Sequence, residues 1–169
     1  MIETLKGSKT CQIVNCFHYL FASAYQVRLV PGGEEPFYRA SRQGEPAEII
    51  FRADYPASAL HEVAHWCLAG WQRRQQDDYG YWYISERSAQ QQRAFEAVES
   101  KPQALEWLFA EAAGVAFRVS SDQVDRLPSD AFVEQVRRSK CELINRLPRR
   151  AETFRKGLSA LGLHPLEGP

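Results

Sequence analysis

Two histidines separated by three residues, His61 and His65, have the spacing in this sequence that most clearly suits chemistry. They belong to an HExxH string, His61-Glu62-Val63-Ala64-His65. In a helix, side chains at i and i+4 lie on one face, so both imidazoles can reach one divalent ion. Glu62 projects in a neighbouring direction, where such a carboxylate acts as general base in zinc peptidases. We interpret the string as a catalytic metal site; two satisfied core histidines on an apolar helix are the alternative.

A catalytic ion needs a third protein ligand. A structural zinc ion wants four, usually including cysteines, and no cysteine pair lies near His61. The next acidic pair occurs in FEAVE, residues 95–99, where Glu96 and Glu99 at i and i+3 share a helical face. Either glutamate can complete a site of two histidines and one carboxylate. For any single glutamate, solvated helix surface is the ordinary alternative.

An aromatic segment joins the two expected metal-bearing helices. It begins with Asp77 and Asp78 and continues as YGYWY, residues 79–83. Tyr79, Tyr81 and Trp82 are expected to wall a pocket for a long aliphatic amine, with Asp77 or Asp78 neutralising its ammonium group. Equally, these aromatic side chains can simply cover the core.

The elements that position these residues follow from the spacing of apolar side chains. The helix after Pro56 is expected to be capped by Ser58 and Gly70. Lys101-Pro102 is expected to start a separate helix that ends at Gly114. Further helices are predicted over residues 8–25, 88–100, 129–147 and 148–161. Short strands are predicted over 27–30, 37–38 and 48–52, with a turn at 31–33.

This pattern predicts an α+β fold that is rich in helices, with a small, mainly antiparallel sheet. The HExxH helix should pack beside the sheet, as the metal helix of zincins does. The 169 residues are enough for one domain spanning 1–169. Its core is expected over about 10–127, followed by a basic helical tail over 128–161.

Charge and composition narrow the function classes. Lys plus Arg and Asp plus Glu both number 21, and this balance does not favour a general nucleic-acid or membrane-surface binder. Three features predict a cytoplasmic protein. The four cysteines are scattered and form no CxxC pair. The sequence shows no basic leader before an apolar core and no apolar stretch of membrane-spanning length. A local excess of Lys and Arg over 137–156 suits an acidic partner, although it is more often a solvated helix face.

Three longer strings together resemble the signature of the elongation factor P hydroxylase family. They are YPASALHEVAHWCLAG at 55–70, DYGYWY at 78–83 and FEAVESKPQALEWL at 95–108. The resemblance covers about residues 10–120, in order and with compatible spacing, whereas the tail after Leu127 matches only loosely.

The resemblance implies a metal-dependent oxygenase that hydroxylates the modified lysine of translation elongation factor P after a β-lysyl group has been attached. The family's metal site maps onto His61, His65 and Glu99, with Glu62 and Glu96 as the remaining candidate catalytic acids. Hydroxylating an unactivated C–H bond needs a redox-active metal with open positions. Iron(II) and molecular oxygen are therefore expected, although the spacing also suits zinc. The expected partner is β-lysylated elongation factor P, with no membrane and no direct nucleic acid.

Two other functions compete with this hypothesis. One is a zincin-type metallopeptidase with Glu62 as general base and Glu48–Arg52 as an edge strand for a substrate peptide. The other is a non-catalytic binding module for the translation machinery that uses the basic tail and a structural ion.

Overall fold

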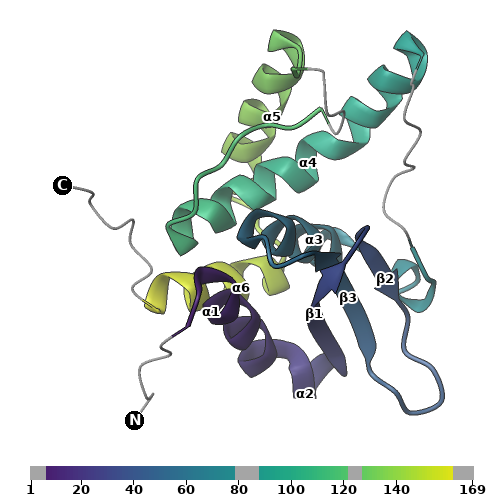
Figure 1. Cartoon of the computed structure of the whole chain (residues 1–169). Helices are drawn as coiled ribbons and strands as arrows, with labels where there is room; N and C mark the ends of the chain where they lie inside the picture. Colours follow the sequence, from purple (N-terminus) through teal and green to yellow (C-terminus); the bar gives the residue numbers. More distant parts are fainter. Residues whose placement is uncertain (1–6, 79–87, 122–126, 162–169) are drawn as a thin grey trace.

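A computed structural model of the chain describes residues 7–78, 88–121 and 127–161 (Figure 1). Its first helix, α1 (Lys9–Phe17), begins after Ser8, whose hydroxyl accepts a hydrogen bond from the N–H of Cys11. The helix continues through a π-helical turn, η1 (His18–Ala22), into α2 (Ser23–Tyr25). Gln26 then adopts a left-handed conformation with φ 48°. The helix predicted over 8–25 is confirmed, with a π-helical turn that apolar spacing did not indicate.

The three strands form one mixed sheet in the order β1-β3-β2. β1 (Val27–Gly33) pairs with β3 (Ala47–Arg52) in parallel, and β2 (Phe37–Arg39) pairs with β3 in antiparallel orientation. The predicted mainly antiparallel sheet is thus wrong in its pairing. Each strand runs opposite to the one before it in the chain, so β3 has the same direction as β1. Because β3 lies between β1 and β2, it pairs with β1 in parallel and with β2 in antiparallel orientation. The turn predicted at 31–33 is part of β1.

The HExxH helix is α3 (Pro56–Leu68). Tyr55 precedes it and Pro56 occupies the first turn, where its missing N–H costs nothing. The predicted caps are therefore wrong. Ser58 lies inside the helix, where its hydroxyl accepts a hydrogen bond from the N–H of Arg52, and Ala69 rather than Gly70 ends the helix. A short 3-10 turn, η2 (Arg73–Gln75), follows.

Residues 89–113 form one long helix, α4 (Ala89–Ala113), where two were predicted. Ser88 and Gln91 make a reciprocal capping box at its start, and Gly114, with φ 62°, ends it. Pro102 lies inside the helix and has no N–H to donate to the carbonyl of Val98. The helix continues because both sides of Pro102 are packed against other elements, and packing outweighs local propensity.

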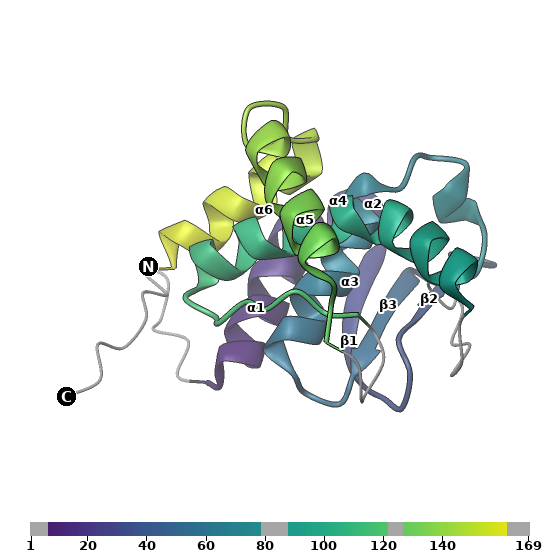
Figure 2. The same cartoon turned by 90° about the horizontal axis from the view of Figure 1, so that it is seen from above.

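Two further helices complete the structure, α5 (Asp130–Leu143) and α6 (Arg149–Ala160). α6 lies beside α1 in both views (Figure 1, Figure 2). Its Phe154 is fully buried in the same core as Phe17 and Phe109. Gly157 permits the close approach of α6 to α1 and η1, because a Cβ atom there would lie 3.0 Å from Sγ of Cys16 and 2.7 Å from Cδ1 of Leu20. The division of the chain into domains stays a prediction.

The helices and the sheet stack in layers that position the two metal-bearing helices. Figure 1 shows α3 between the sheet and α4, with α5 on the other side of α4. The α+β class and the place of the HExxH helix beside the sheet are confirmed. Of the helices within the described ranges, none combines the length and apolar character that crossing a membrane requires.

Candidate metal centre

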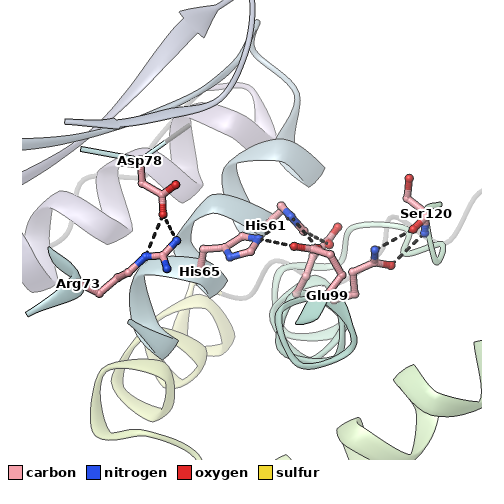
Figure 3. Close-up of polar contacts among 8 residues, drawn as sticks. His61, His65, Arg73, Asp78, Glu99 and Ser120 are labelled. Atoms are coloured by element: carbon pink, nitrogen blue, oxygen red, sulfur yellow. Dashed lines mark hydrogen bonds and ion pairs between the residues drawn. The ribbon is translucent and has the colours of Figure 1, made fainter. Parts of the chain in front are cut away.

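His61 and His65 on α3 converge with Glu99 on α4 (Figure 3). Nε2 of His65 lies 3.2 Å from Oε1 of Glu99, and Nε2 of His61 lies 3.5 Å from Oε2 of the same carboxylate. The two Nε2 atoms are 3.0 Å apart. Three residues from two helices therefore each bring a ligand atom to within 4.8 Å of the other two.

These separations can be compared with those around a bound ion. Nitrogen and oxygen ligands lie about 2.0–2.2 Å from a zinc ion, so neighbouring ligand atoms are about 2.8–3.6 Å apart at octahedral or tetrahedral angles. The three observed distances fall within that range, and the donor set of two imidazoles and one carboxylate fits a divalent ion. With three ligands from the described part of the chain, an ion of this kind would have positions left for other molecules.

Glu99 is held in an almost fully buried environment, with 3% of its surface exposed. Burial alone would raise the pKa of its carboxyl group, but hydrogen bonds from His65 and Gln103 and the charges of both histidines lower it instead. Gln103 is itself fixed, because its amide donates to the carbonyl of Ser120 and accepts from the Ser120 N–H. The ligand carboxylate is thus oriented by a buried polar network.

Glu106 on α4 is a site residue that the sequence analysis missed. Its Oε2 lies 2.8 Å from Nδ1 of His61, which places the ring proton on Nδ1 and directs Nε2 toward Glu99. Burial would lower the pKa of His61, but Glu106, Glu99 and Glu62 outweigh burial and raise it to about 10. Glu106 lies seven residues after Glu99, two helical turns along the same face. That spacing was the signal available in the sequence.

The other acidic residues predicted for the site are placed differently. Glu62 lies beside His65 on the wall of a cleft, and burial raises the pKa of its carboxyl group. Glu96 does not join the three ligand atoms; its carboxylate accepts a hydrogen bond of 3.1 Å from the Gln92 amide.

The cleft has a volume of about 470 Å³ and extends from the metal centre toward the sheet. Tyr38 and Ile49 of the sheet, Trp66 of α3, and Val98 and Pro102 of α4 are among its walls. Such a volume suits a long, flexible ligand side chain.

Asp78 also lines this cleft, where its carboxylate forms an ion pair with Arg73 (Figure 3). Asp77 pairs with Arg42 and accepts a hydrogen bond from the Ala40 N–H. The predicted pocket residues Tyr79, Tyr81 and Trp82 lie outside the described residues.

One arginine of the basic tail contacts the metal helix. Nη2 of Arg150, on α6, donates to the carbonyl oxygens of Trp66, Cys67 and Ala69 at distances of 3.0, 3.1 and 2.7 Å. The guanidinium also lies over the Trp66 ring, 4.8 Å from its centroid. These carbonyls at the end of α3 have few partners within the helix, so Arg150 supplies a donor to each of them, and Arg74 supplies a second donor to Ala69. For Arg150, a solvated helix face was the wrong interpretation.

Comparison with known proteins agrees with the resemblance found in the motifs. A sequence profile of the family described as elongation factor P hydroxylase matches residues 16–164. The chain is also similar to the elongation factor P lysine hydroxylase of Haemophilus influenzae. The two are 45% identical over 156 residues, which cover 88% of this chain and 86% of that protein.

Proposed function

This chain belongs to the elongation factor P hydroxylase family, and we propose that it hydroxylates the β-lysylated lysine side chain of translation elongation factor P with a metal ion bound by His61, His65 and Glu99. The observation that supports the metal-dependent part of this proposal is the convergence of three ligand atoms from two helices beside a cleft. Neither the metallopeptidase nor the binding-module hypothesis gains support from the comparisons.

The reaction inserts one oxygen atom into a C–H bond. With molecular oxygen as co-substrate, two electrons and two protons are also consumed, and the products are the alcohol and water. A bound iron(II) ion would supply the redox chemistry, which zinc lacks. The protein's part is to supply the three side chains that would hold the ion, His61, His65 and Glu99, next to a cleft that admits the substrate.

The residues around the three ligands orient the ligand side chains and form the walls for the substrate. Glu106 keeps the proton of His61 on Nδ1, and Gln103 keeps the Glu99 carboxylate in place. The apolar side chains of Trp66, Val98 and Pro102 provide walls for the methylene groups of a modified lysine. We propose Asp78, Tyr79, Tyr81 and Trp82 as further contacts of that side chain and Glu96 as an acid near its path.

The direct test is mass spectrometry of β-lysylated elongation factor P after incubation with the protein, iron(II), ascorbate and heavy-isotope oxygen. We expect a mass gain of one labelled oxygen atom on the modified lysine. His65→Ala should give no gain, because it removes a metal ligand while leaving the cleft in place. A wild-type protein with bound iron that adds no oxygen would contradict the proposal.

A further inference from the structure

Three carboxylates, those of Glu62, Glu99 and Glu106, surround the two histidines of the metal centre. Two of them contact the imidazole nitrogens directly: Glu99 lies against both Nε2 atoms, and Glu106 lies against Nδ1 of His61. Glu62 has no such contact among the described residues and lines the cleft instead. Buried charges are stable in proteins when they are paired.

Glu62 also differs from the other acidic side chain of the cleft. Asp78 already has Arg73 as a counterion. Glu62 makes no hydrogen bond and no ion pair with another residue in the described part of the chain. Of the basic side chains lining the cleft, Arg73 pairs with Asp78, Arg74 donates to the Ala69 carbonyl and Lys101 is exposed. Among the described residues that line the cleft, Glu62 is therefore the acidic group that is available to a ligand.

We infer that Glu62 binds an ammonium group of the substrate and so makes the enzyme selective for the β-lysyl extension. This inference rests on the proposed function and names how that site recognises its ligand. A β-lysyl group has two primary amines joined by methylene groups. The amine suits the Glu62 carboxylate, and the methylenes suit the apolar walls formed by Trp66, Val98 and Pro102. Glu62 then acts as a specificity-determining residue rather than as the general base of a peptidase.

A small-molecule experiment tests Glu62 without depending on elongation factor P. The zinc-loaded protein, which cannot turn over, is titrated with β-lysinamide and with its doubly N-acetylated form, which has no amine. Trp66 lines the cleft, so tryptophan fluorescence is a suitable signal. We expect the wild type to bind the amine at least about tenfold more tightly, as the loss of a charge-assisted hydrogen bond implies. Glu62→Gln should abolish this preference, and Glu62→Asp should retain part of it.

Glu134→Gln on α5, at a side chain that is 44% exposed and does not line the cleft, is the matched control and should keep the full preference. Zinc content is measured for every variant, so that loss of metal is not mistaken for loss of amine binding. Equal binding of the two compounds by the wild type would overturn the inference. So would a Glu62→Gln protein with zinc bound and an unchanged preference.

A second arm separates this inference from the proposed function. The wild type and Glu62→Gln are assayed for hydroxylation of β-lysylated elongation factor P. We expect Glu62→Gln to raise KM about tenfold with a much smaller change in kcat, because the lost contact holds the ligand. A fall in kcat alone would instead assign Glu62 to proton transfer and overturn the inference. If the wild type hydroxylates nothing, the proposed function fails, while the amine titration still decides the role of Glu62.

Discussion

Oε2 of Glu106 lies 2.8 Å from Nδ1 of His61, so the helix that provides Glu99 to the metal centre also orients one of its histidines. The two glutamates lie seven residues apart on α4 and face the same imidazole from its two nitrogen atoms. Two contacts therefore hold α4 against α3, and both involve a residue of the metal centre.

Removing Glu106 should weaken metal binding without removing a ligand. Glu106→Leu is expected to lower zinc affinity roughly 10–100-fold, because His61 loses the acceptor that fixes its tautomer. Glu106→Gln keeps an acceptor but no charge, and should lose less. Competition with a chromophoric chelator measures the affinities, with Glu111→Gln, one turn beyond on α4, as control. Wild-type affinity in Glu106→Leu would contradict the role of Glu106 in positioning His61.

Glu99 and Glu96 should differ sharply in their effect on metal content. Glu99→Ala removes a ligand and should abolish stoichiometric binding of iron(II) or zinc, whereas Glu96→Ala should bind a full equivalent. Because a bound ion stabilises only the folded state, added zinc should raise the Tm of the wild type and of Glu96→Ala but not that of Glu99→Ala. Metal analysis together with thermal unfolding checks both statements. A metal-free Glu96→Ala protein would show that the wrong glutamate has been chosen.

Arg150 should stabilise the fold through the end of the metal helix. Arg150→Met leaves the carbonyls of Trp66, Cys67 and Ala69 without this donor, and we expect a loss of about 2–3 kcal/mol in the free energy of unfolding. Arg149→Met changes the adjacent, exposed arginine and should change stability by less than about 0.5 kcal/mol. Urea unfolding measures both variants. Equal stabilities for the two would mean that the hydrogen bonds of Arg150 contribute nothing.

His18 should make stability depend on pH. Its Nε2 accepts a hydrogen bond of 3.0 Å from the Leu29 N–H, which requires a neutral ring. Burial, with a smaller contribution from the Arg28 charge, lowers the pKa of His18 below its ordinary value of 6.5.

The unfolded chain therefore takes up this proton more readily than the folded protein. The stabilising contribution of His18 is complete above about pH 6.5 and is lost as the pH falls from there through the lower pKa of the folded state. Urea unfolding between about pH 8 and about pH 5 should show the wild type losing more stability than His18→Gln, whose amide does not titrate. Parallel pH profiles would contradict this account.

The parts of the metal centre that depend on one helix could be predicted from the sequence. His61 and His65 share a face whenever residues 61–65 are helical, whatever surrounds them. Spacing alone did not decide whether Glu96 or Glu99 is the third ligand. That choice depends on how α4 is rotated about its axis, and packing against α3 sets this rotation. The family motifs favoured Glu99. Glu106 was missed for the related reason that its partner is on another helix.

The errors in the predicted fold also arise from contacts between elements that are distant in the sequence. Apolar spacing located the helices and strands. The insertion of β3 between β1 and β2 depends on contacts between residues far apart in the sequence, which local sequence patterns do not indicate. Pro102 indicated a helix break, and the packing of the residues around it overrides that preference. Arg150 looked like one of several surface cations, because nothing near it in the sequence identifies the carbonyl groups that it meets.

The contact between Arg150 and the end of α3 has a consequence for biosynthesis. The carbonyl of Ala69 precedes its partner by 81 residues, so the metal helix leaves the ribosome long before Arg150 has been translated. Until then the end of α3 lacks these donors, and the face of α1 that receives Phe154 is open to water. We expect nascent chains that stop before α6 to be prone to aggregation and to bind metal poorly, so that the complete metal site forms only once α6 has been translated.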